Sequence, residues 1–162
     1  MDNGTTAESL VHPDAPQGKR FFGMCDMRRA VIILNIVGLV MSAMALLGEL
    51  FNQYGTDARA VVVALVVGVL YGLALVGAVK YRPWFLIGII VYSIVSIASL
   101  FGHAIYLWSV LGLRQPVVPF MLFGIVVTAA FLYAHVILFQ EMRQGIMTPE
   151  NYPKEKHSCC CV

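Results

Sequence analysis

Four long apolar stretches limit what this chain can fold into. They run from about Ala30 to Phe51, Ala60 to Val79, Trp84 to Trp108 and Val118 to Gln140, and none contains lysine, arginine or aspartate. About 20 apolar residues let a helix cross the ~30 Å hydrocarbon core of a bilayer, where backbone hydrogen bonds must be satisfied internally. The sequence therefore predicts an all-α integral membrane protein, a four-helix transmembrane bundle over residues 30–140 between an N-terminal tail (1–29) and a C-terminal tail (141–162).

The small share of charged residues supports this class. Charged residues make up 12% of the chain and apolar residues 59%, whereas a soluble domain has about 25% charged and about 45–50% apolar residues. A disordered chain needs the opposite balance, and a nucleic-acid-binding protein needs a stronger positive field than a net charge of +2 supplies. We therefore exclude a soluble globule, a disordered chain and a nucleic-acid partner, and we expect the lipid bilayer to surround the bundle.

The basic residues predict how the spans are oriented, because lysine and arginine near span ends are retained on the cytoplasmic side. Nine of the eleven lie before the first span, between the second and third, or after the fourth: Lys19, Arg20, Arg28, Arg29, Lys80, Arg82, Arg143, Lys154 and Lys156. The other two, Arg59 and Arg114, lie in the first and third connections. Both termini are therefore expected in the cytosol, in an endomembrane or plasma-membrane protein.

The two connections on the opposite side are too short for a folded domain. Residues 52–59 and 109–116 form them, and neither contains a cysteine for a disulfide. Recognition of a partner by a folded ectodomain is therefore not expected. The chain should act through neighbours in the membrane or through its tails.

All four cysteines are predicted to lie on the cytosolic side. Cys25 shortly precedes the first span, and Cys159, Cys160 and Cys161 stand just before Val162. Cysteines beside the cytosolic face of a membrane are the usual acceptors for palmitoylation, and the last four residues also have the outline of a prenylation box. Palmitoylation is the favoured interpretation, since the residues after Cys159 depart from that box. Prenylation, free thiols and a metal site are the alternatives; adjacent cysteines match no zinc spacing, so no metal is expected.

The second span carries small residues at four-residue intervals. Ala60, Ala64, Gly68 and Gly72 lie on one face of a helix and end in a GxxxG unit. Small residues let another helix approach closely and gain dispersion contacts within lipid. We expect this stripe to pack inside the bundle; the alternative is a homo-oligomer formed through the second span.

Polar side chains within the spans are the first candidates for function in a membrane. Glu49, the one acid in the spans, and His103 lie at similar depth near the outer ends of the first and third spans, which allows a hydrogen bond between them. Asn35 and His135 each lie five residues from the cytosolic end of their spans and form a second pair of matched depth. Hydrogen bonds between helices are the favoured interpretation, and a proton or cation path is the alternative.

The segment before the first span resembles that of a known family. The stretch from Phe21 to Ala30 (FFGMCDMRRA) leads into Val-Ile-Ile-Leu and places a cysteine and two arginines before an apolar helix. This stretch and the plan of four spans resemble the lysosome-associated four-transmembrane family. The resemblance implies an endosomal or lysosomal protein that acts as a trafficking adaptor or regulator of other membrane proteins. The family's Pro-Pro-x-Tyr tail motif is missing, since Pro149-Glu-Asn-Tyr152 has one proline.

Together these features predict an accessory, scaffold or trafficking protein that acts through partner membrane proteins. The sequence has no HExxH, GxSxG or glycine-rich phosphate motif and no carboxylate pair within the spans, so we expect neither enzymatic activity nor a cofactor. The alternative is a small transporter or channel subunit that uses the region of Glu49 and His103.

Overall fold

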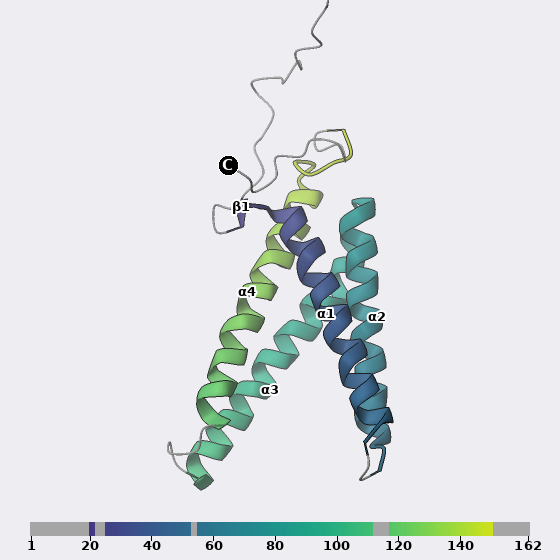
Figure 1. Ribbon diagram of the computed structural model, residues 1–162. Helices are drawn as coiled ribbons and strands as arrows, with labels where there is room; N and C mark the ends of the chain where they lie inside the picture. Colours follow the sequence, from purple (N-terminus) through teal and green to yellow (C-terminus); the bar gives the residue numbers. More distant parts are fainter. Residues whose placement is uncertain (1–19, 22–24, 53–54, 112–116, 151–162) are drawn as a thin grey trace, which may run out of the picture.

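Four long helices make up most of the computed structural model, which describes residues 20–21, 25–52, 55–111 and 117–150 (Figure 1). The helices are α1 (Met27–Leu50), α2 (Ala58–Lys80), α3 (Ile87–Leu111) and α4 (Val117–Arg143), and a 3-10 turn, η1 (Pro83–Leu86), leads into α3. Two short strands, β1 (Arg20–Phe21) and β2 (Cys25–Asp26), pair in antiparallel register before α1. All four helices are long and apolar enough to cross a membrane, so the predicted all-α four-helix architecture is confirmed.

Local signals in the sequence set the ends of two helices. Asp57 precedes α2, and its side-chain Oδ1 accepts a hydrogen bond from the backbone N–H of Arg59 at 2.9 Å, which caps a free donor of the first turn. Gly145 follows α4 with a φ of 71°, in the left-handed region that glycine adopts without strain. The next amide, of Ile146, donates to the carbonyl oxygen of Glu141 at 3.0 Å. This is the longer hydrogen bond of a Schellman motif, and it turns the chain back after α4.

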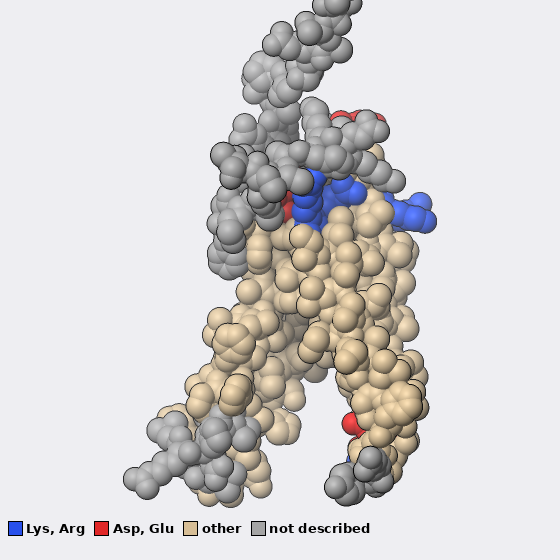
Figure 2. Space-filling model, in the orientation of Figure 1, with Lys and Arg blue, Asp and Glu red and all other residues tan. Residues whose placement is uncertain are grey.

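The helices form two hairpins, α1 with α2 and α3 with α4, that meet at one end and diverge toward the other (Figure 1). The meeting end, called the tail end, holds the start of α1, the end of α4 and the connection from α2 to η1. The opposite end, called the open end, holds the end of α1, the start of α2, the end of α3 and the start of α4. The space-filling view shows the two arms separated at the open end (Figure 2).

The buried core lies in the tail-end half of the bundle. Ala74 and Ala78 of α2 and Ala134 of α4 are completely buried. Side chains this small let helix backbones approach closely and gain van der Waals contact where lipid provides no hydrophobic drive. The other members of the core are Met27, Val31, Leu86, Ile89, Leu138, Met142 and Met147. Ala74 and Ala78 repeat the four-residue spacing of the predicted stripe, nearer the tail end.

Two close approaches hold α1 against α2. The Ser42 hydroxyl donates to the carbonyl oxygen of Ala64 at 2.6 Å, and a Cβ on Gly68 would lie 3.0 Å from the same hydroxyl oxygen. The ring of Tyr71 lies beside Gly38, where an added Cβ would come within 2.5 Å of a ring carbon. Part of the predicted stripe therefore packs within this hairpin.

Large apolar side chains cover the outside of the helices. Val95 is 62% exposed and Phe123 is 68% exposed, which suits contact with lipid tails and would be a liability in water. Most of the described lysines and arginines lie at the tail end (Figure 2), namely Arg28, Arg29, Lys80, Arg82 and Arg143. The chain is a multi-pass membrane protein.

We expect Gly38→Ala to destabilise the protein and Gly48→Ala to leave its stability unchanged or slightly raised. Both glycines lie in α1, but a Cβ at Gly38 meets the Tyr71 ring, whereas a Cβ at Gly48 meets no described atom within 4 Å. Overpacking of this kind costs about 1–3 kcal/mol. The unfolding temperature of the purified protein in detergent, followed by loss of the monodisperse size-exclusion peak, measures the effect. Equal losses in the two variants would contradict the close contact between α1 and α2.

Candidate functional site

A buried hydrogen bond joins the two hairpins. Asn35 of α1 and His135 of α4 are both completely buried, and Asn35 Nδ2 lies 3.0 Å from His135 Nε2. Equal depth in the membrane predicts this pair, and the structure brings the two side chains together. The bond ties the first helix to the last across 100 positions of sequence.

A neighbouring carbonyl sets the tautomer of the histidine. His135 Nδ1 lies 2.7 Å from the carbonyl oxygen of Phe131, and because a carbonyl can only accept, Nδ1 carries a hydrogen. Nε2 then accepts from one N–H of the Asn35 amide, whose other N–H donates to the carbonyl oxygen of Val31 at 2.8 Å. The amide oxygen of Asn35 lies farther from Nε2, at 3.2 Å. Both ring nitrogens are thus occupied within the protein, and the pair links two helices.

Aromatic rings support this pair. The Phe131 ring stacks on the His135 ring with centroids 5.8 Å apart, and the Tyr71 ring meets Phe131 edge-on at 6.2 Å. An aromatic pair such as Tyr71 and Phe131 is worth about 0.5–1.5 kcal/mol beyond its burial. We call Asn35, Tyr71, Phe131 and His135 the hairpin joint, because they come from α1, α2 and α4 and hold the hairpins together.

An apolar groove begins at the hairpin joint and lies between the arms. It has a volume of about 380 Å³ and is lined by residues of α1, α2 and α4. We call it the inner groove; its lining residues are Val37, Gly38, Met41, Ser42, Val67, Tyr71, Val127 and Phe131. Tyr71 and Phe131 belong to both features, so the hairpin joint closes one end of the inner groove. The exposed side chains of Met41 and Val127 enter it from opposite hairpins.

At the tail end, an arginine caps the last turn of α2. Arg28 of α1 donates from Nε to the carbonyl oxygen of Ala78 at 2.9 Å and from Nη2 to that of Val79 at 3.2 Å. The last carbonyls of a helix have no partner within it and carry partial negative charge, so a cation there is stabilising. The sequence predicts Arg28 only as an orienting charge, because no local pattern signals its contact with α2.

The same arginine stabilises an unusual backbone conformation. Tyr81 follows α2 with a φ of 55°, and the left-handed region costs a residue with a Cβ roughly 1–2 kcal/mol. The Arg28 guanidinium lies 4.1 Å from the centre of the Tyr81 ring, a favourable cation–π contact. Burial raises the pKa of the Tyr81 hydroxyl, and the positive charge of Arg28 acts in the opposite direction. The hydroxyl therefore stays neutral at physiological pH.

The structure does not bring Glu49 and His103 together. Glu49 lies at the end of α1 and His103 lies on α3, and these helices belong to different arms at the open end (Figure 1). The His103 side chain is exposed, and its Nδ1 bonds the carbonyl oxygen of Ser99 in its own helix at 2.9 Å. Equal depth is not enough here, because the hairpins diverge before they reach that depth. The hydrogen bond that the sequence allows is therefore not made.

The acid that the structure buries is Glu141. The helix α4 continues past Gln140 to Arg143, so Glu141 lies inside it and is only 4% exposed. Glu49 is partly buried near the open end. The fourth helix extends beyond its apolar stretch, and Glu49 remains the one acid predicted within the apolar stretches themselves.

Two of the four small residues in the α2 stripe contact α1. Ala64 and Gly68 lie against Ser42. Ala60 is partly buried, and a Cβ on Gly72 would meet no described atom within 4 Å. The stripe therefore serves packing within the hairpin at its middle positions.

The predicted lipidation sites fall largely outside the described residues. Cys159, Cys160 and Cys161 lie outside them, and the backbone of Cys25 belongs to β2. Within the described ranges, no three histidine, cysteine, aspartate or glutamate side chains lie close enough together to hold a metal ion.

No family model, curated protein or solved structure matches the chain. Its function is therefore inferred from the geometry of the hairpin joint and the inner groove.

Replacing either Asn35 or His135 should lower the free energy of unfolding nearly as much as replacing both. Asn35→Leu removes the donor to His135 Nε2, and His135→Leu removes the acceptor of an Asn35 N–H, each at a buried site. Hydrogen bonds between helices in membranes average about 0.6 kcal/mol and reach about 1.7 kcal/mol. We expect a coupling energy in this range from a double-mutant cycle, measured by unfolding with sodium dodecyl sulfate.

The matched control for this cycle is Ser93→Ala, which removes a buried hydrogen bond within one helix, from the Ser93 hydroxyl to the carbonyl oxygen of Ile89 at 2.8 Å. It should not couple to Asn35→Leu. Strictly additive losses for Asn35→Leu and His135→Leu would show that the two side chains do not stabilise each other.

Proposed function

We propose that this chain is a multi-pass accessory or scaffold protein of the membrane trafficking system, which binds partner membrane proteins within the bilayer. The observation that carries the proposal is the inner groove, an apolar surface left between two hairpins that are held together at the joint. Within lipid no hydrophobic force closes such a gap, so an apolar helix can replace the lipid there. This role needs neither catalysis nor a cofactor.

The residues of the inner groove suit contact with a helix. Met41 and Val127 are exposed in the groove, and Met41 offers an unbranched side chain that adapts its shape to a partner helix. The partner that fits is a transmembrane helix with small residues on one face. A second copy of this chain, packed through Ala60 and Gly72 of the stripe, is the alternative partner.

A small transporter or channel subunit is the alternative function, and it has less support. It would use Glu49 and His103, which lie on separate arms. The Ser93 and Thr128 hydroxyls donate to carbonyl oxygens of their own helices. A path for ions needs polar groups that are available to replace water, and the Ser93 and Thr128 hydroxyls are already hydrogen-bonded within their own helices.

We also propose that both termini face the cytosol of an endomembrane or plasma-membrane protein. The basic residues at the tail end of the described structure, among them Arg28, Arg29, Lys80, Arg82 and Arg143, support this orientation, because lysine and arginine are retained on the cytoplasmic side. The resemblance of the segment before α1 to the lysosome-associated four-transmembrane family favours endosomes or lysosomes within that range.

On this orientation we expect S-palmitoylation of the C-terminal cysteines. Acyl-biotin exchange should label the wild type only after hydroxylamine, which cleaves thioesters, and the label should fall strongly when Cys159, Cys160 and Cys161 are all changed to serine. Cys25→Ser alone is the matched control and should retain most of the label. No hydroxylamine-dependent label on the wild type would contradict acylation, and a hydroxylamine-resistant lipid on Cys159 would indicate prenylation instead.

Photocrosslinking from the inner groove tests the proposed function. Benzoylphenylalanine in place of Met41 or Val127 puts the reactive group into the groove from opposite hairpins. Val63, which is 58% exposed and does not line the groove, is the matched control position. We expect the same membrane protein to be captured in native membranes from positions 41 and 127 and not from position 63.

A variant that fills the groove sharpens this experiment. Val67→Phe adds volume inside the groove and should lower capture from both positions while the unfolding temperature stays near that of the wild type. Capture of lipid alone from all three positions would contradict the proposal. Capture of a second copy of this chain would assign the groove to self-association.

A further inference from the structure

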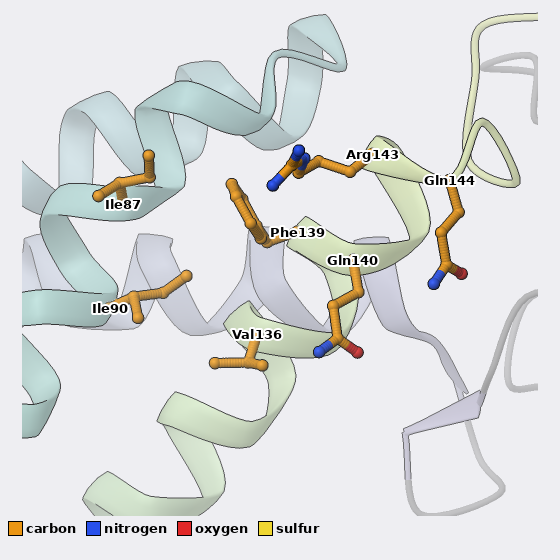
Figure 3. A pocket seen from close by; sticks show the side chains of 7 residues that line it. All are labelled: Ile87, Ile90, Val136, Phe139, Gln140, Arg143 and Gln144. Atoms are coloured by element: carbon orange, nitrogen blue, oxygen red, sulfur yellow. The ribbon is translucent and has the colours of Figure 1, made fainter.

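A second cavity lies at the tail end, between the start of α3 and the end of α4 (Figure 3). Its volume is about 710 Å³. Ile87 and Ile90 of α3 and Val136 and Phe139 of α4 form its apolar floor. We call it the tail-end pocket, and we propose that it binds one anionic phospholipid from the surrounding membrane.

The rim of the tail-end pocket is polar and belongs to the end of α4. Gln140, Arg143 and Gln144 line it, and all three are exposed. The guanidinium carbon of Arg143 lies 5.8 Å from the centre of the Phe139 ring, and Figure 3 shows the arginine side chain reaching back toward that ring. The cation–π contact keeps the charge above the apolar floor instead of letting it extend away.

The apolar floor and the polar rim together suit a phosphate that is joined to apolar chains. A guanidinium donates two parallel hydrogen bonds to phosphate oxygens. The amides of Gln140 and Gln144 add donors, and they can also accept from a hydroxyl or ammonium group on the lipid. The lining residues carry one positive charge and no acid, and basic pockets between spans on the cytoplasmic side are typical sites for anionic headgroups.

The negative end of the α4 helix dipole also lies here and opposes an anion. Three backbone carbonyls of its last turn are hydrogen-bonded: Gln140 accepts from the backbone N–H of Gln144 at 2.9 Å, Glu141 from that of Ile146 at 3.0 Å and Met142 from that of Gly145 at 3.3 Å. The turn at Gly145 therefore reduces the unfavourable field, and the charge of Arg143 offsets the remainder.

The apolar floor favours a lipid over a soluble anion. Ile94 lies one turn beyond Ile90 on the same face of α3 and is 53% exposed. Acyl chains can thus continue from the floor along the lipid-facing surface of α3 while the headgroup stays at the rim. A soluble phosphate would use the rim alone and make no contact with the apolar floor.

Quenching of tryptophan by brominated lipids tests this proposal in the full-length protein. The chain has two tryptophans, Trp84 in η1, one turn before Ile87, and Trp108 toward the open end of α3. Trp108→Phe therefore leaves one reporter near the tail-end pocket. The protein is reconstituted in phosphatidylcholine vesicles that contain a small fraction of either brominated phosphatidylserine or brominated phosphatidylcholine. We expect the apparent association constant for phosphatidylserine to exceed that for phosphatidylcholine about fivefold.

Three variants separate the pocket from the general charge of the tail end. Arg143→Gln should bring the ratio of the two association constants close to one. Val136→Phe, which fills the floor without changing charge, should also lower it. Lys80→Gln removes the same charge from an exposed tail-end residue that does not line the pocket, and it should preserve the ratio.

Equal quenching by the two lipids in the wild type would overturn the proposal. So would equal loss of the preference in Lys80→Gln and Arg143→Gln, because a general surface field would then explain it. Displacement of phosphatidylserine by millimolar inorganic phosphate would assign the rim to a soluble anion and would also overturn it. Unfolding temperatures show which variants are folded. If Arg143→Gln does not fold, the comparison of the two lipids on the wild type tests the proposal.

Discussion

In the hydrocarbon core of a membrane, an apolar helix gains little by exchanging contacts with lipid for contacts with another apolar helix. The helices of this protein accordingly meet where small residues let their backbones approach or where polar groups pair. Ala74, Ala78 and Ala134 provide the close approach near the tail end, and Asn35 with His135 provides the polar pair. Beyond these contacts the two hairpins diverge (Figure 1), and the inner groove is the result.

Basic residues have more than one role at the tail end. Arg28 is directed inward, onto the last carbonyls of α2 and the ring of Tyr81, and so fixes the start of α1 against the end of α2. Arg143 lies over the Phe139 ring beside the tail-end pocket. Both count equally in a prediction of membrane orientation, but their neighbours give one a structural role and leave the other available to a ligand.

The spans and one polar pair could be predicted from the sequence because both depend on position along the helix axis. Apolar length sets where a helix crosses the membrane, and counting residues from the border sets the depth of Asn35 and His135. The tilt and rotation of each helix depend on which residues pack at the crossing, and counting does not provide them. Glu49 and His103 share a depth and still lie on different arms for this reason.

The same limit explains what the sequence did not reveal about the tail end. The contact of Arg28 with Ala78 joins residues 50 positions apart, and no local pattern encodes it. Small residues four apart predict close packing correctly at Ala64 and Gly68, but the same spacing at Ala74 and Ala78 marks the core shared with α4. Spacing identifies a face that can pack closely, and the partner of that face is decided by the whole fold.

The hairpin joint lies nearer the tail end of α1 than its open end. At a rise of about 1.5 Å per residue, Asn35 lies about 12 Å from Met27 at the start of α1 and about 22 Å from Leu50 at its end. A rotation of about 10° between the arms at the joint would move the open end of α1 by about 4 Å. The buried core fills the tail-end half, so an occupant of the inner groove can change the spacing of the arms at the open end while the tail end stays packed.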